Sequence, residues 1–417
     1  MRILLWHGYL LGGTGSNVYT RQLAREWSRA GHDVTVLSQE PRPEAHDLGG
    51  AAVVRPDVHG FLPVFVLDRY EGYEVRRVQD CAREELDAWV DANAAAIRAL
   101  LPADLVFTNH VLLGGPVGAA TGARYAVKAH GSELEYSMRG NAELERWGRE
   151  SLEHAAATFV GSGHIRTVLE EVCGTVARVH EVPPGVDVDL WRPEEGGAAL
   201  EAVVREARLD APNPGNRHER QPDGGNAARL EAFLAGDAPP TVVFFGKLIE
   251  QKGVDVLLDA FAGLDARLVV VGFGPERERL EERAHAEGVR SLFTGPLEHR
   301  HLRHLLALAD ACVVPSVFPE AFGMVAAEAA AAGCPPVVAR HSGLAEVAAG
   351  LEEALPKGLG ELVSFPTADA EALHARLERL LALAPDERAT LRTTVRRVVE
   401  ERWSWASVAE RLLEASS

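Results

Sequence analysis

The feature that most constrains the fold is a succession of short apolar runs, glycine-containing loops and amphipathic stretches that opens each half of the chain. Residues 2–6 form an apolar run, the loop HGYLLGGTGSN follows, and an amphipathic stretch at residues 18–30 leads to the apolar run HDVTVLS. The second half opens similarly, with TVVFFG, the loop KLIEQKG and a helical pattern at residues 254–262. Strand, glycine loop, helix and strand in this order make half of a Rossmann-like domain. The 417 residues therefore predict an α/β protein with two such domains.

Composition narrows the partners and the compartment. The formal net charge of −18 argues against nucleic acid or an anionic membrane as a partner, because both favour a basic surface. The four cysteines have no CxxC spacing, so we expect buried thiols in a reducing compartment. No apolar run approaches the ~18 residues of a spanning helix. These features predict a cytoplasmic protein with a small or neutral acceptor and, at most, peripheral membrane contact; the oligomeric state stays open.

Two carboxylates mark the stretch at residues 313–347, which is predicted to run from a buried strand through a loop and a helix to another strand. Glu320 lies in the loop and Glu328 in the helix, which should open near Phe322. The N–H groups at a helix start bind anions. Met324 and Glu328 share one stripe, and side chains lean toward the helix N-terminus. A ligand with phosphate between two hydroxylated groups would fit, which describes a nucleotide-diphosphate sugar.

The run PEAFGMVAAEAAAAGCPPVVA resembles the E-x7-E signature of retaining glycosyltransferases with two Rossmann-like domains, the GT-B fold of the family 4 glycosyltransferases. The resemblance extends over nearly the whole chain. It implies two facing domains: an acceptor domain at 1–190, joined by a crossing helix at 404–417, and a nucleotide-sugar domain at 191–403. A long insertion at about 194–240 departs from the family, and no function is assigned to it. Residues 75–101 are predicted to form one long helix.

Two further motifs extend the resemblance. His130 directly follows a predicted strand in AVKAHGSELE, which matches the family's H-G-x-[DE]-like turn near the donor sugar. Lys247 and Lys252 match the family's G-R-x4-K-G pattern, with lysine where arginine is usual. Ammonium groups there would neutralise the departing nucleoside diphosphate, although lysine lacks the bidentate grip of arginine.

The resemblance assigns roles residue by residue. Catalytic roles are expected for His130, Lys247, Lys252 and Glu320. Donor contacts are expected from Gly13, Gly15, Gly246, Gly272, Leu297, Ala321, Phe322, Gly323, Met324 and Glu328. Acceptor contacts are expected from Gly12, Thr14, Asn17, Lys128 and Arg139.

The predicted reaction moves a sugar from a nucleotide-diphosphate sugar to an acceptor hydroxyl with retention of anomeric configuration. Glu320 would hold hydroxyls of the donor sugar, Glu328 would hold the ribose, and the leaving phosphate would accept the acceptor's proton. UDP sugars are the first expectation, with GDP and ADP sugars as alternatives, and no cofactor is required. We expect no metal site, because His299, His301 and His304 do not have HExxH spacing.

Three other functions are compatible with the sequence. A sugar-nucleotide 2-epimerase would share the architecture and would yield an epimerised donor instead of a transferred sugar. An NAD(P)-dependent oxidoreductase is less well supported, because Val18 stands where the dinucleotide motif needs a third small residue. A non-enzymatic sugar-nucleotide-binding subunit would bind the donor without turnover.

Overall fold

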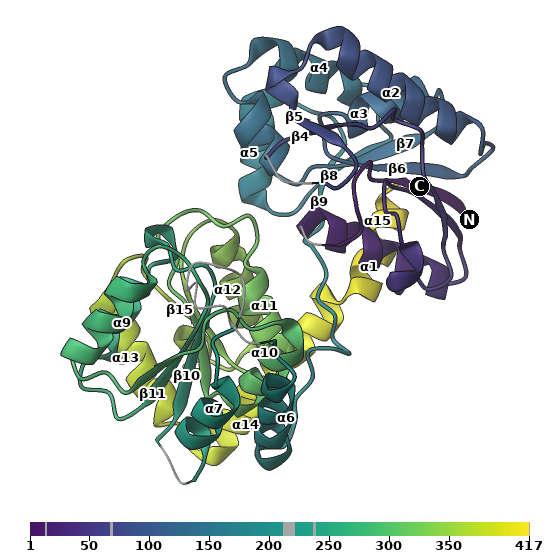
Figure 1. The fold of residues 1–417 in the computed structure, drawn as a ribbon. Helices are drawn as coiled ribbons and strands as arrows, with labels where there is room; N and C mark the ends of the chain where they lie inside the picture. Colours follow the sequence, from purple (N-terminus) through teal and green to yellow (C-terminus); the bar gives the residue numbers. More distant parts are fainter. Residues whose placement is uncertain (13–14, 67–69, 212–221, 237–238, 417) are drawn as a thin grey trace. The chain divides into compact units, whose positions relative to one another are not determined.

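The chain divides into two compact units. The computed structural model describes residues 1–12, 15–66, 70–211, 222–236 and 239–416. One unit comprises Met1–Gly185 with Trp405–Ser417, and the other comprises Val186–Ser404 (Figure 1). Each unit is built around its own parallel sheet with helices on both faces, as the sequence predicts.

The sheet of the first unit has seven parallel strands in the order β3-β2-β1-β6-β7-β8-β9. Their bounds are β1 (Arg2–Trp6), β2 (Asp33–Leu37), β3 (Ala52–Val54), β6 (Leu105–Asn109), β7 (Tyr125–Lys128), β8 (Ala157–Val160) and β9 (Val179–Glu181). The strand order reverses between β1 and β6, where Leu4 pairs with Val106. Ligands of open parallel sheets bind at the carboxyl ends of the strands flanking such a reversal.

Helices cover both faces of this sheet because parallel strands are apolar on both sides. They are α1 (Gly15–Arg29), α2 (Arg83–Arg98), α3 (Gly114–Ala120), α4 (Ala142–Leu152), α5 (Gly163–Cys173) and α15 (Trp405–Ser416), with helical turns at Pro43–Ala45, Val78–Asp80 and Leu134–Met138. The carboxyl-terminal helix α15, yellow in Figure 1, lies beside α1. There the indole N–H of Trp27 donates to the carbonyl oxygen of Ala409 at 3.0 Å. The chain thus returns to its first unit at its end.

One sequence prediction in this unit is wrong. The helix predicted over residues 75–101 is split, since β5 (Glu74–Arg77) pairs with β4 (Phe61–Val64) and α2 begins only at Arg83. The side chain of Glu85 accepts a hydrogen bond from the backbone N–H of Ala82 at 3.0 Å and closes the start of α2. Strand pairing with residues 61–64 therefore overrides the helical pattern of residues 75–80.

The sheet of the second unit has six parallel strands in the order β12-β11-β10-β13-β14-β15, with the reversal between β10 and β13. The strands are β10 (Thr241–Phe245), β11 (Arg267–Val271), β12 (Ser291–Phe293), β13 (Ala311–Val314), β14 (Pro336–Ala339) and β15 (Ser364–Phe365). The helices are α6 (Gly196–Arg208), α7 (Asn226–Leu234), α8 (Val254–Phe261), α9 (Arg277–Ala286), α10 (His299–Leu308), α11 (Met324–Ala331), α12 (Ser342–Ala354), α13 (Ala370–Leu381) and α14 (Pro385–Val398), with turns at Glu250–Lys252, Gly360–Leu362 and Val399–Trp403.

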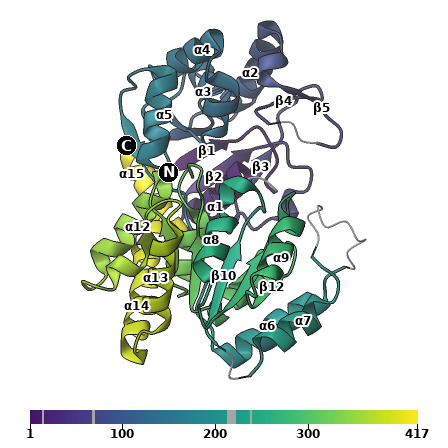
Figure 2. The same ribbon diagram turned by 90° about the vertical axis from the view of Figure 1, so that its left-hand side faces the viewer.

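The described part of the insertion adds α6 and α7 to the second unit (Figure 2). Helix α6 packs on α10, where Arg300 of α10 donates to Glu206 of α6 at 3.2 Å and to Asp210 at 2.5 Å. Val203 and Leu230 of the two added helices are fully buried in the core of the unit. The insertion is thus partly a structural extension of this domain.

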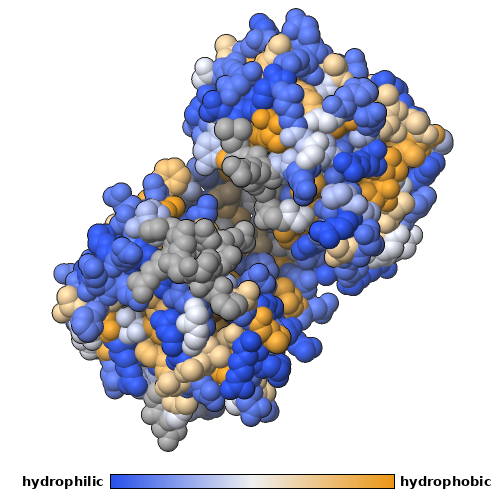
Figure 3. Space-filling view, viewed as in Figure 1, coloured by the Kyte–Doolittle hydropathy of each residue, from blue (hydrophilic) through white to orange (hydrophobic). Residues whose placement is uncertain are grey.

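The surface is mainly hydrophilic. On the face shown in Figure 3, hydrophilic residues predominate on each unit and apolar residues form scattered patches. No helix among the described residues combines the length and the apolar character needed to cross a bilayer.

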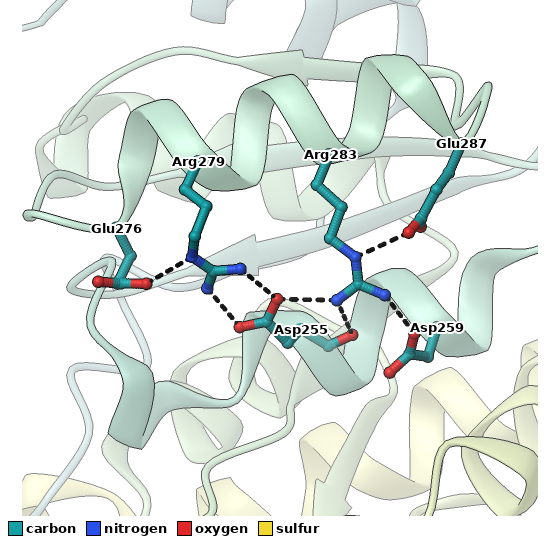
Figure 4. Close-up of polar contacts among 6 residues, drawn as sticks. All are labelled: Asp255, Asp259, Glu276, Arg279, Arg283 and Glu287. Atoms are coloured by element: carbon teal, nitrogen blue, oxygen red, sulfur yellow. Dashed lines mark hydrogen bonds and ion pairs between the residues drawn. The ribbon is translucent and has the colours of Figure 1, made fainter.

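A network of ion pairs ties α8 to α9 (Figure 4). Arg283 contacts Asp255 at 2.8 Å and Glu287 at 2.8 Å, and it also pairs with Asp259. Arg279 contacts the same Asp255 carboxylate at 2.6 Å. Exposed pairs contribute little singly, but several that share one arginine hold the two helices in register.

Replacing Arg283 with methionine should lower the free energy of unfolding by roughly 1 kcal/mol, because three partly exposed pairs are lost together. Urea denaturation measures the effect, which should shrink in high salt through screening. Arg397→Met is the control, since Arg397 is exposed and, among the described residues, forms an ion pair with Glu401 alone. Equal losses in the two variants would show that the network adds nothing beyond single pairs.

Candidate functional site

In the second unit, the loops that follow β10 and β13 bring Lys252 and Glu320 together. The two strands are neighbours at the reversal of strand order, so both loops emerge where such sheets bind ligands. The loops pack closely, because the N–H of Val317 donates to the carbonyl oxygen of Gln251 at 3.0 Å. A side chain at Gly253, whose φ is +66°, would place its Cβ only 2.1 Å from a carbonyl oxygen of the other loop.

One of the two carboxylate oxygens of Glu320 is bound by neighbouring side chains. Its Oε1 accepts from the Ser316 hydroxyl at 2.6 Å and forms an ion pair with the ammonium of Lys252. The side chains of Lys252 and Glu320 are 30% and 23% exposed, so a ligand can reach both groups. The arrangement leaves Oε2 of Glu320 as an acceptor for hydroxyl groups.

Helix α11 follows directly and is lined with alanine. Gly323 precedes it with a φ of +115°, and a Cβ there would lie 2.8 Å from Leu344. The first N–H groups of a helix lack intrahelical partners and attract anions. Glu328 lies partly buried on this helix, and no described residue hydrogen-bonds its carboxyl group. Burial raises the pKa of Glu328 to about 8.

The other residues expected to contact the donor have different surroundings. Lys247 is exposed, and it forms no ion pair with any residue that the structure describes. A Cβ on Gly272 would lie 1.8 Å from the carbonyl oxygen of Gly246, so this glycine permits close packing of the two loops. Leu297 is buried and Ala321 is exposed.

Phe322 and Met324 flank Gly323 at the start of α11. Phe322 is buried, with its ring edge-to-face against Trp403 at a centroid distance of 5.7 Å. Met324 is half-buried. Phe322 therefore anchors the loop, while the backbone between these two residues forms the amino end of the helix.

In the first unit, three histidines meet at the carboxyl ends of β1, β6 and β7. These are His7, His110 and His130, each just beyond its strand. The ring centroids of His110 and His130 are 4.7 Å apart, and those of His7 and His110 are 5.9 Å apart. His110 has a φ of +70°, which is strained for a residue with a side chain. The cluster lies at the reversal of strand order, the ligand-binding position of such a sheet.

The hydrogen bonds of Asn109 determine which nitrogen of the His130 imidazole carries the proton. The side-chain amide of Asn109 donates to the carbonyl oxygen of Trp6 at 3.2 Å, and that oxygen can only accept. The amide oxygen of Asn109 therefore faces Nε2 of His130 at 2.7 Å, and Nε2 must donate. Burial is the largest of the effects that lower the pKa of His130 well below its ordinary value. The ring is neutral, so its Nδ1 carries a lone pair that can accept a proton from a hydroxyl donor.

Glu133 crosslinks the loops that carry two of these histidines. It is fully buried, its Oε1 accepts the backbone N–H of His130 at 2.9 Å, and its Oε2 contacts Nδ1 of His110 at 3.2 Å. Burial by itself would raise the pKa of Glu133, but the charge and hydrogen bond of His110 outweigh it and the pKa is lowered. Glu133 is therefore an ionised anchor of the cluster.

Two basic residues expected near the acceptor are occupied by protein groups. Lys128 is buried, its ammonium donates to the carbonyl oxygen of Val182 at 3.0 Å, and burial lowers its pKa to about 7. Arg139 is exposed and pairs with Glu135 at 2.7 Å and Glu171 at 3.0 Å.

The glycine loop of the first unit is described in part. Asn17 is buried, and its amide binds the carbonyl oxygen of Gly12 at 2.5 Å and Nε2 of His7 at 2.7 Å. Gly15 begins α1. The expected contacts of Gly13 and Thr14 lie outside the described residues.

Histidines 299, 301 and 304 do not converge. His304 binds Glu194 at 2.5 Å, His301 lies 3.0 Å from Asp210, and the ring of His299 packs near Trp191. Among the residues that the structure describes, no group of three or more histidine, cysteine, aspartate or glutamate residues could hold a metal ion.

Sequence reasoning missed several residues of these sites. Asn109 ends β6 and His110 follows it directly, so the position at the carboxyl end of a strand that marks His130 also marks these two residues. Ser316 lies in the Glu320 loop, and His341 and Ser342 contact this loop. These three residues also lie two or three positions beyond a strand, so the same criterion would have found them.

Each of the two units is an α/β domain with charged or polar side chains at a reversal of strand order. Two family models match the chain: "Glycosyl transferases group 1" over residues 230–398 and "Glycosyltransferase Family 4" over residues 13–190. Between them the two models span most of the chain, and they confirm the predicted assignment to the family 4 glycosyltransferases. The matches fall mainly on the second and the first unit, respectively.

Relatives of known name share part of this sequence. A GDP-mannose-dependent alpha-(1-6)-phosphatidylinositol monomannoside mannosyltransferase of Mycolicibacterium smegmatis is 29% identical over 319 residues, 73% of this chain and 72% of that protein. A D-inositol 3-phosphate glycosyltransferase of Xylanimonas cellulosilytica is 33% identical over 247 residues, 57% of this chain and 50% of that protein.

Solved structures share the fold over the full length. Sucrose-phosphate synthase from Thermosynechococcus elongatus is similar with a TM-score of 0.62 at 23% identity and covers 100% of both chains. Anabaena Alr3699/HepE in complex with UDP is similar with a TM-score of 0.68 at 16% identity and covers 99% of both chains. The predicted fold class is thereby confirmed.

Proposed function

We propose that this glycosyltransferase moves a sugar from a nucleotide-diphosphate sugar to an acceptor hydroxyl and retains the anomeric configuration. The observation that carries the proposal is the accessible pair of Lys252 and Glu320 beside the amino end of α11. A cation and helix N–H groups suit a diphosphate, and a carboxylate suits sugar hydroxyls. A nucleotide-diphosphate sugar offers a partner to each of these three groups.

The geometry of the second unit supports a role for each of these groups. Lys252 would neutralise the charge that grows on the leaving diphosphate, and Glu320 would accept hydrogen bonds from the donor sugar through Oε2. Glu328 would accept the ribose hydroxyls, which supply the donors its carboxyl group needs. Because Oε1 of Glu320 is engaged by Ser316 and Lys252, we assign Glu320 a binding role instead of a nucleophilic one. A diphosphate oxygen would then accept the proton of the acceptor.

The first unit is proposed to contribute the lone pair of His130 Nδ1 to a substrate hydroxyl. For the donor, relatives at 29% identity are named for GDP-mannose, so this donor joins the UDP sugars that the sequence analysis ranks first. For the acceptor, we propose a polyol or a sugar-substituted polyol, since the relatives' names specify inositol derivatives.

A donor screen tests this function. The protein is incubated with GDP-mannose, UDP-glucose, UDP-N-acetylglucosamine and ADP-glucose, with and without inositol phosphate or mannosyl polyols, and products are followed by mass spectrometry. We expect one donor to be consumed and its sugar to appear on an acceptor, with its anomeric configuration kept in the NMR spectrum. An epimerised donor, an inverted product, or tight donor binding without any product would each contradict the proposal.

A further inference from the structure

The loop that carries Glu320 is tied to the start of α12 by two side chains that sequence analysis did not identify. His341 and Ser342 follow β14 and contact both ends of this loop. We propose that His341 and Ser342 are positioning residues, which set the Glu320 carboxylate for the donor sugar through a closed ring of hydrogen bonds. The inference rests on the proposed donor-binding role of Glu320.

The direction of each hydrogen bond in this closed ring can be assigned, because some of its groups can only accept and others can only donate. Nε2 of His341 lies 2.6 Å from the carbonyl oxygen of Ser316, so Nε2 carries a proton and donates. When the imidazole of His341 is neutral, its Nδ1 then has a lone pair, and this Nδ1 lies 2.9 Å from the hydroxyl of Ser342. That hydroxyl also lies 2.8 Å from the backbone N–H of Glu320, which can only donate. Ser342 therefore accepts from Glu320 and gives its own proton to His341.

The ring closes through Ser316. Its carbonyl oxygen accepts from His341, while its hydroxyl donates to Oε1 of Glu320 at 2.6 Å. The backbone and the carboxylate of Glu320 are thus fixed by one connected set of four residues. Every donor in the set has an acceptor, which is the condition under which a partly buried polar network becomes rigid.

The backbone at the start of α12 is shaped for this contact. Gly343 donates its N–H to the carbonyl oxygen of Glu320 at 3.0 Å, and a Cβ on Gly343 would lie 2.4 Å from Cα of Phe322. Ser342 has a φ of +44°, a strained conformation for a residue that is not glycine. A glycine would relieve this strain, so the presence of serine points to a need for its hydroxyl group.

His341 and Ser342 act on the donor only through Glu320. Loss of the ring would free the loop at both ends, and a displacement of about 1 Å at a reacting group can cost about 100-fold in rate. We expect His341→Leu to lower kcat/KM for the donor ~10- to 100-fold, mainly through kcat. His341→Gln should keep activity within about threefold of wild type, because a carboxamide can donate to Ser316 and accept from Ser342.

Ser342→Gly is the second variant, since it removes the hydroxyl and relaxes the backbone. Its melting temperature should equal or exceed that of wild type, while its kcat/KM should fall as far as that of His341→Leu. This variant keeps the test informative even if His341→Leu does not fold. Full activity in Ser342→Gly, or equal activity in the leucine and glutamine variants, would overturn the inference.

NMR of the protein labelled with 15N-histidine shows which nitrogen of His341 carries the proton, and this measurement does not depend on catalytic turnover. The resonance that disappears in His341→Gln is assigned to His341, and we expect a protonated Nε2 and an unprotonated Nδ1. A protonated Nδ1 would contradict the proton order of the ring. If wild type transfers no sugar from any donor, the proposed function fails, whereas a wrong proton order together with normal transfer refutes only this inference.

Discussion

Replacing Lys252 with methionine is expected to lower kcat/KM for the nucleotide sugar by about 100- to 1,000-fold while the protein stays folded. The ammonium is the charge that the structure places beside Glu320 and the amino end of α11. Methionine keeps most of the side-chain volume and removes only the charge. The loss should appear mainly in kcat, because negative charge on the leaving diphosphate is larger in the transition state than in the bound donor.

Lys357→Met is the matched control, since Lys357 is an exposed lysine of the same unit outside the candidate site. Steady-state kinetics and circular dichroism are measured for both variants. Glu320→Ala should also lose turnover by orders of magnitude, and the double variant should lose less than the product of the two single losses because the groups are in contact. Near-wild-type rates in both single variants would refute the assigned site.

The second large effect is expected at Glu328. Replacing it with glutamine should make the protein more stable at alkaline pH and should weaken the binding of a nucleoside diphosphate at least tenfold. The folded-state pKa of about 8 lies above the ordinary value of 4.5, so the ionised carboxylate costs folding free energy. Ribose hydroxyls would offset this cost when they donate hydrogen bonds to the carboxylate. Loss of the carboxylate should therefore weaken the binding of the nucleoside diphosphate.

The sign of the pH dependence follows from linkage. Because the folded pKa is raised, wild type pays no cost below the ordinary pKa, loses stability between pH 4.5 and about 8, and is constant above. Between about pH 6 and about pH 8.5, the stability advantage of Glu328→Gln should grow by ~2 kcal/mol. Urea denaturation at the two pH values measures it, with Glu353→Gln on the exposed face of α12 as the control. A pH-independent difference would show that Glu328 titrates normally.

Much of the fold could be predicted because the pattern of apolar and polar residues that marks each helix or strand lies within that element. Buried parallel strands are short apolar runs, and glycine loops and amphipathic helices separate them, so the apolar run at residues 2–6 correctly predicts β1. The error at residues 75–101 arose where a local pattern was compatible with two structures. There, pairing with residues 61–64 decided the outcome, and this partner cannot be read from the segment itself.

The candidate site was predictable only in part. His130, Lys252 and Glu320 could be identified because each follows a strand in a recognisable motif. Lys128 is expected near the acceptor as a positive charge, yet its ammonium is buried against a backbone carbonyl oxygen. The position of a residue along a strand does not reveal on which face its side chain lies once the sheet is covered on both sides.

The sequence by itself determined the class of fold, the family and the chemical types of the candidate binding groups, since these depend on local periodicity and on short motifs. The tertiary structure alone decided which groups meet. Lys252 and Glu320 are 68 residues apart and pair because β10 and β13 are neighbours at the strand reversal. His341 reaches Ser316 across 25 residues for the same reason, since β14 lies next to β13. Contacts between loops of adjacent parallel strands depend on strand order, and strand order is a property of the folded sheet.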